Sequence, residues 1–236
     1  MRPRNGVANR TRRAFAAIIA LALATVPAVL AQTPGSQRSA SQGNGNAAPP
    51  IDVATAKALN AAVDALNMGK YDEARAALAP LKIDRLSPYE RSRLEQILAN
   101  IAAALEKYDE ARVHVDNAIR AGGLNEQETS ELRFQIAQLF MAEGKWKEGA
   151  ASLEEWFKTA PSPNSAAYYL LAAAYYQSED YDRALAPAKR AVELMSAPQE
   201  SWITMLLSLY MQREEFKDAI PLLVRLIALA PDKKSY

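Results

Sequence analysis

The stretch Gly69-Lys70-Tyr71-Asp72-Glu73-Ala74 decides the fold, because related stretches recur four more times along the chain. Lys107-Tyr108-Asp109-Glu110-Ala111 repeats it closely, and looser copies occupy residues 144–149, 180–184 and 215–219. The aromatic residues of the five copies are 37, 38, 35 and 35 residues apart and are Tyr71, Tyr108, Trp146, Tyr181 and Phe216. A period of this length is typical of a stacked repeat array.

The composition predicts a helical protein with a sizeable core. Half of the 236 residues are apolar, and no run alternates apolar and polar residues with a period of two. This pattern favours helices over strands. The sequence contains no cysteine, which excludes disulfides, thiolate metal sites, a cysteine nucleophile and a cysteine-linked lipid anchor.

The charge distribution argues against nucleic-acid binding. The net charge of the whole chain is +1, but residues 1–31 contain five arginines and no acidic residue. The remaining residues carry 23 basic and 27 acidic side chains, a net charge of −4. A weakly acidic chain without a basic stripe lacks the electrostatic footprint of a nucleic-acid-binding protein.

Residues 1–31 have the pattern of a signal peptide. The five arginines precede an apolar run at 15–25, and Val29-Leu30-Ala31 offers small residues for cleavage near Ala31. We therefore expect a periplasmic or otherwise exported protein without stable membrane insertion. An uncleaved anchor over residues 14–31 is the alternative. Thr11-Arg12-Arg13 leaves open whether export follows the general or the twin-arginine route.

Residues 32–50 are predicted to be a disordered linker. The segment consists mainly of Gln, Ser, Gly, Asn and Pro and has no large apolar side chain to bury. The folded part is therefore expected to span 51–236.

Each repeat is predicted to contain two helices joined by a turn at the recurring stretch. In the first repeat, one helix ends near Asn67 and the next begins near Tyr71, with Asp72 and Glu73 in its first turn, where acids favour the helix dipole. Ser87-Pro88-Tyr89-Glu90 has the form of a capping box, and residues 125–128 resemble it. Prolines at 161, 163 and 198 separate the later repeats.

The repeat resembles the tetratricopeptide repeat over residues 51–236. That family places a small residue three positions after the turn aromatic, and this chain has Ala74, Ala111, Gly149, Ala184 and Ala219 there. Ten positions after the aromatic, the family prefers a small or apolar residue, and the chain has Leu81, Ala118, Trp156, Ala191 and Leu226. The resemblance implies an all-α, right-handed superhelical solenoid of about five helix–turn–helix repeats. Repeats three to five match the pattern better than the first two.

No pattern in the sequence points to catalysis, a cofactor or a metal. His114 is the only histidine, and we expect it to be solvated among neighbouring carboxylates. No phosphate-binding glycine loop, nucleophile motif or metal-ligand spacing is present. The sequence therefore predicts a non-enzymatic protein.

The resemblance implies a binding groove on the concave side, lined by the first helix of each repeat. The predicted peptide-binding residues are Asn67, Arg93, Gln96, Asn100, Phe134, Gln138, Met141, Tyr169, Tyr176, Gln177, Ser208, Met211 and Gln212. Amide side chains would bind an extended backbone, and aromatic and methionine side chains would bind its apolar residues. The alternative is that Phe134, Met141 and Tyr169 complete the packing between repeats. Arg93 is the only cation among these positions, which disfavours a clamp for C-terminal carboxylates.

Two functional hypotheses follow. The first is a protein–protein interaction scaffold of the bacterial cell envelope, which binds a protein or peptide in the groove. The second is an envelope-assembly or carrier protein that binds a lipid or a cell-wall glycan. No capping helix follows Pro231, so we also expect either missing repeats or self-association at that end.

Overall fold

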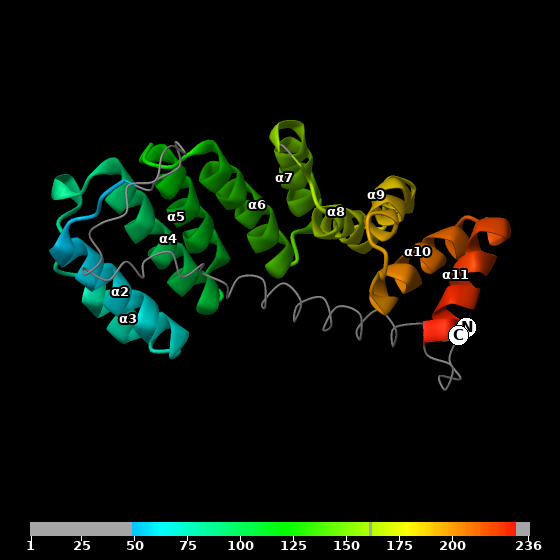
Figure 1. The fold of residues 1–236 in the computed structure, drawn as a ribbon, viewed down its shortest axis with the longest axis horizontal. Coiled ribbons are helices and arrows are strands. Elements are labelled where there is room, and N and C mark those ends of the chain that lie inside the picture. The colour runs from blue at the N-terminus through cyan, green and yellow to red at the C-terminus, as the bar shows by residue number, and fades with distance from the viewer. Residues whose placement is uncertain (1–48, 161, 230–236) are drawn as a thin grey trace, which may run out of the picture. The chain divides into compact units, whose positions relative to one another are not determined.

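The computed structural model describes residues 49–160 and 162–229, where the regular structure is helical and contains no strand (Figure 1). The elements are α2 (Val53–Asn67), α3 (Tyr71–Leu78), the short 3-10 helix η1 (Ile83–Arg85), α4 (Pro88–Ala104), α5 (Tyr108–Arg120), α6 (Glu126–Ala142), α7 (Trp146–Thr159), α8 (Ser165–Gln177), α9 (Tyr181–Glu193), α10 (Glu200–Gln212) and α11 (Phe216–Leu229). The all-α prediction is confirmed. The predicted signal peptide, most of the predicted linker and residues 230–236 lie outside the described residues.

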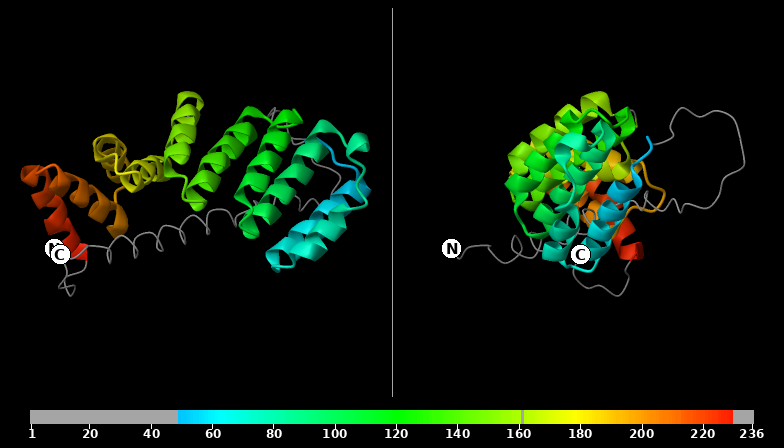
Figure 2. Two further views of the ribbon diagram at one scale, coloured as in Figure 1. Left: turned by 180° about the vertical axis from the view of Figure 1, so that it is seen from behind. Right: turned by 90° about the vertical axis from the view of Figure 1, so that its left-hand side faces the viewer.

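The helices form two compact units, with the division after Gln135, inside α6. In the first unit, α2 packs on α3 and α4 packs on α5, while α4 also contacts α2 and α3 (Figures 1 and 2). In the second unit, each helix from α7 to α11 packs on the next one along the chain. The chain therefore forms helix–turn–helix pairs at the positions that the repeats predict.

All five recurring stretches form turns with the same backbone geometry. In the first turn, the Lys70 N–H donates a 2.9 Å hydrogen bond to the carbonyl oxygen of Ala65, five residues earlier, and the equivalent bond is present in the other four turns. This bond is typical of a helix that ends in a left-handed residue. The left-handed residue stands two positions before each turn aromatic, and these residues are Gly69, Glu106, Gly144, Glu179 and Glu214.

Small residues let the two helices of a pair approach closely. The five residues that stand three positions after the turn aromatics are all buried. At Gly149, an added Cβ would lie 2.8 Å from the Cγ of Met141, closer than side-chain atoms normally come. The small residues of the recurring stretch are therefore required by helix packing.

Side-chain caps fix where the helices begin. Ser87 and Glu90 form the predicted capping box of α4. At the start of α6, Asn125 and Glu128 exchange equivalent bonds of 3.0 and 2.8 Å between backbone N–H groups and side-chain oxygens. Asp52, which the sequence analysis did not single out, caps α2 by accepting from two backbone N–H groups of the first turn.

The first repeat departs from the expected pattern in its second helix. α3 ends at Leu78, so Leu81 lies beyond the helix and is only half-buried. Pro80 explains this, because the residue before a proline is disfavoured in helical conformation and proline itself has no N–H to donate. Leu81 still packs against the core of the first unit, in which Leu86 is buried.

Candidate functional site

In the first unit, three of the predicted binding residues lie on one face of α4. Arg93, Gln96 and Asn100 are three and four positions apart, a spacing that places side chains on the same side of a helix. All three are half-buried. They therefore form a continuous polar strip along the first helix of the second repeat.

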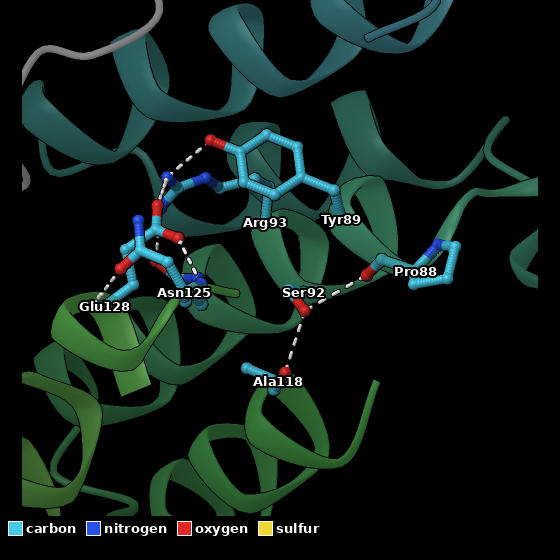
Figure 3. A network of polar contacts seen from close by, with 8 residues as sticks. Pro88, Tyr89, Ser92, Arg93, Ala118, Asn125 and Glu128 are labelled. Carbon is cyan, nitrogen blue, oxygen red and sulfur yellow. Dashed lines mark hydrogen bonds and ion pairs between the residues drawn. The ribbon is translucent and has the colours of Figure 1, made fainter. Parts of the chain in front are cut away.

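Arg93 is held by a network of contacts within the protein (Figure 3). Its Nη2 donates a 2.6 Å hydrogen bond to the Tyr89 hydroxyl and forms an ion pair with Glu128 of α6. The guanidinium also lies 4.7 Å from the centre of the Tyr89 ring. Because Glu128 neutralises its charge, Arg93 does not offer a free cation to the carboxylate of a ligand.

The two amides of the strip differ in how their hydrogen-bonding groups are used. Gln96 Oε1 accepts from Arg93 Nη1 at 3.0 Å, and Asn100 Oδ1 accepts from Gln135 Nε2 at 3.0 Å. The Gln96 Nε2 atom is buried and has no hydrogen-bond partner among the described residues. Unpaired buried donors are uncommon in folded proteins, and this nitrogen is shielded from solvent, so it is not itself open to a ligand.

In the second unit, Met141 and Tyr169 are buried in the packing between helices. Met141 is 2% exposed and contacts Gly149, whereas Tyr169 is 4% exposed. The Tyr169 ring stacks on Trp202 of α10 with the ring centres 4.6 Å apart. Met141 and Tyr169 therefore do not line an open groove as predicted, because their side chains fill the spaces between adjacent helices.

Burial also suppresses the acidity of Tyr169. Desolvation raises the pKa of its hydroxyl to about 12, although a hydrogen bond with Ser201 acts in the opposite direction. A phenol with so high a pKa stays protonated at neutral pH. The burial of Tyr169 and the stacking of its ring on Trp202 identify it as a packing residue.

The other predicted binding residues keep at least partial exposure. The ring of Tyr176 meets that of Tyr181 edge to face, with centres 5.4 Å apart. The Ser208 hydroxyl donates to the Thr204 carbonyl oxygen at 2.8 Å, within its own helix. The residues that remain half-buried are Phe134, Gln138, Tyr176, Gln177 and Ser208. The residues that are exposed, each at the end of a first helix, are Asn67, Met211 and Gln212.

Polar contacts between repeats in the first unit join residues that stand 35 positions apart. Arg75 Nη2 lies 2.6 Å from Glu110 Oε1. The Arg93–Glu128 and Asn100–Gln135 pairs are also 35 residues apart in the sequence. Glu128 and Gln135, which bind Arg93 and Asn100 of the strip, were not among the predicted site residues. These partners stand two or three residues closer in sequence than the 37- and 38-residue repeats of this unit, so they are not equivalent residues and the repeat pattern alone does not pair them.

His114 is not solvated as expected. Its Nδ1 lies 2.7 Å from Glu95 Oε2, and its side chain is only 20% exposed because α4 packs over this face of α5. Within residues 49–160 and 162–229, no group of three or more histidine, cysteine or acidic residues is placed to hold a metal ion. In the same ranges, none of the helices combines the length and hydrophobicity that crossing a membrane requires.

Comparisons with known proteins agree with the helix-pair architecture. The MamA fragment beginning at residue 41 from Desulfovibrio magneticus RS-1 has a TM-score of 0.62 at 19% identity, covering 79% of this chain and all of that one. TPR-like repeats of a putative kinesin light chain from Podospora anserina have a TM-score of 0.60 at 17% identity, covering 79% of this chain and all of that one. At these identities the likeness shows the fold.

A family model adds a sequence match. The tetratricopeptide repeat model matches residues 204–235, which include the fifth recurring stretch. No curated protein matches the sequence. The sequence match identifies a tetratricopeptide repeat at residues 204–235, and the five equivalent turns and the structural likeness show that the described helix pairs have the fold of such repeats.

Proposed function

We propose that this protein is a non-enzymatic interaction scaffold of the bacterial cell envelope, which binds an extended segment of a partner protein along the first helices of its repeats. The observation that carries the proposal is the strip on α4, where the half-buried amide side chains of Gln96 and Asn100 lie one helical turn apart. The tetratricopeptide repeat fold supports the general role of an interaction scaffold.

The spacing of the strip suits an extended peptide. Side chains four positions apart on a helix are separated by about 6 Å, and every second residue of an extended chain is separated by about 6.6 Å. An amide side chain can both donate and accept, so it can pair with the N–H or the C=O of a peptide bond. Gln96 and Asn100 therefore match two successive peptide groups on the same side of a bound strand.

In the second unit, the ring of Tyr176 offers an apolar contact next to the amide side chain of Gln177. Tyr176 and Gln177 end α8, and both are half-buried. The Tyr176 ring has one aromatic neighbour, Tyr181, and its partial exposure leaves apolar surface for a ligand side chain. Because Arg93 of the first unit is neutralised by Glu128, the proposal favours an internal peptide segment over a chain end with a free carboxylate.

Peptide display on the purified protein tests the binding proposal. With a peptide selected on the wild type, the double variant Tyr176→Ala/Gln177→Ala should bind about 10- to 100-fold more weakly, since an aromatic contact and a hydrogen bond are lost. The matched control is Lys189→Ala/Arg190→Ala, on the exposed side of α9. Equal affinity of both double variants, with unchanged helicity, would refute the assignment of Tyr176 and Gln177.

The envelope setting rests on the sequence of residues 1–31 and has its own test. Expression of the full chain in a bacterial host should yield a mature protein in the periplasmic fraction that begins at Gln32. N-terminal sequencing and mass spectrometry measure this directly. A cytoplasmic protein that keeps residues 1–31 would contradict the envelope setting and leave the binding test unaffected.

A further inference from the structure

The last helix of the described chain carries an apolar stripe on its outer face. Phe216, Ile220, Val224 and Ile227 are four, four and three positions apart, so they lie on one side of α11. They are between 49% and 61% exposed. The buried side of α11, which includes Ala219 and Leu226, adjoins the stripe, and α11 packs on α10.

The equivalent face of α9 shows what such a stripe normally contacts. α9 packs on α8, its partner in the pair, and is also covered by the following helix, α10. The position in α9 that corresponds to Val224 is Lys189, which is exposed, whereas the position that corresponds to Ile227 is Val192, which is buried. The stripe of α11 thus has an apolar residue, Val224, where α9 has the exposed Lys189, and four exposed apolar side chains on one helix face are typical of a contact surface.

We propose that the stripe, Phe216, Ile220, Val224 and Ile227, is a dimer interface in which α11 of a second copy of this chain packs antiparallel to it. A two-fold axis near residue 222 places Ile220 against Val224 of the second copy and Phe216 near its Ile227. Such an arrangement uses the same surface on both copies, as closed dimers require.

The charges of α11 favour a second copy over an unrelated helix. Arg75, Arg120, Lys158 and Arg190 each stand in the last turn of a second helix, where a cation favours the helix dipole, whereas the last turn of α11 has no basic residue. Lys217 borders the stripe in the first turn of α11. In the antiparallel pair it lies beside the carboxyl end of the other α11 and supplies the missing cation. Arg225 points elsewhere, since its Nη2 donates to the Ser196 carbonyl oxygen at 3.2 Å.

The size of the stripe sets the expected strength of the dimer. Four large side chains that are about half exposed amount to roughly 400 Å² on each copy. An interface of roughly 800 Å² in total is smaller than those of stable complexes, which bury about 1,200–2,000 Å², and therefore suits weak, transient association. We therefore expect a dimer that dissociates in the micromolar range and is visible as a concentration-dependent mass.

Analytical ultracentrifugation of the full chain between about 1 and 200 μM tests the proposal. The wild type should pass from monomer to dimer, and Val224→Glu should weaken the dimer at least about 30-fold, because it places a carboxylate in the interface of each copy. The matched control is Val113→Glu, because Val113 on α5 is also an exposed valine, at 57%. A wild type that stays monomeric throughout, or equal effects of the two variants, would overturn the proposal.

Cysteine pairing tests the antiparallel arrangement, and the absence of native cysteine makes it unambiguous. A mixture of Ile220→Cys and Val224→Cys proteins should form a mixed disulfide dimer under mild oxidation, more readily than Ile220→Cys alone. Preferential pairing of Ile220→Cys with itself would indicate parallel helices and overturn the stated geometry. Lys217→Glu should weaken the dimer several-fold at low ionic strength and less at high ionic strength.

Discussion

Replacing Glu90 by glutamine should destabilise the first unit although the shape of the side chain is kept. Glu90 is 6% exposed, and its carboxylate joins the starts of two helices. Its Oε2 accepts from the backbone N–H and the hydroxyl of Ser87, both at 2.8 Å, and its Oε1 accepts from the Asp52 N–H at 2.8 Å. Ser87 begins α4 and Asp52 begins α2, so one side chain fixes the position of both helix ends.

The magnitude follows from the two backbone hydrogen bonds. A glutamine has one oxygen, so one of the two backbone N–H groups would face an NH₂ group and lose its acceptor. A hydrogen bond to a charged group contributes about 1.5–3 kcal/mol, and the remaining bond would become neutral and weaker. We therefore expect Glu90→Gln to lower the free energy of unfolding by about 2–3 kcal/mol at pH 7.

The same contacts set the pH dependence of this contribution. Burial raises the pKa of Glu90, but the hydrogen bonds from Ser87 and Asp52 outweigh it, and the pKa lies below its ordinary value. A group with a lowered folded pKa contributes stability above its unfolded pKa of about 4.3 and loses it as the pH falls through the folded pKa. The difference between wild type and Glu90→Gln should therefore narrow below about pH 4.

Urea unfolding followed by circular dichroism at pH 7 and pH 3.5 measures both effects. The matched control is Glu126→Gln, because Glu126 also stands in the first turn of a helix but is exposed. Its effect should stay within about 0.5 kcal/mol. If the two variants lose the same stability, the helix dipole accounts for Glu90 and the reasoning from its hydrogen bonds is refuted.

Three further predictions use the same unfolding assay or proton titration. Glu106→Gly should stabilise the protein by about 0.5–1 kcal/mol, because Glu106 has a φ of 58°; a lower urea midpoint would contradict this. Gly123→Ala should destabilise it by about 3 kcal/mol or more, because an added Cβ would lie 2.2 Å from the backbone nitrogen of Tyr89. Arg75→Ala should raise the pKa of Glu110, now held below its ordinary value first by the hydrogen bond from Arg75; an unchanged pKa by NMR would count against that pairing.

Several parts of the fold could be predicted because they depend on local interactions. The capping box at Ser87 needs only residues within one turn, and the small residues after each turn aromatic reflect contacts within a single helix pair. The shortened α3 was missed, although the signal at Pro80 is also local. The cap at Asp52 was also missed, although it is a local signal directly before the first residue of α2.

The candidate binding surface was harder to predict because exposure depends on neighbouring repeats. Tyr169 and Tyr176 are both aromatic and both lie on α8, and only the stacking of Trp202 on Tyr169 separates the buried ring from the partly exposed one. The pairing of Arg93 with Glu128 likewise arises between two repeats.

By itself, the sequence determined the helix pairs and the shared turn at Gly69 and its four equivalents, because hydrogen bonds within a few residues specify where helices begin and end. Only the tertiary structure decided which helix faces remain open. In the tertiary structure Met141 is buried, Arg93 is paired with Glu128 and the stripe of α11 is exposed, because burial depends on which neighbouring helices pack against each face.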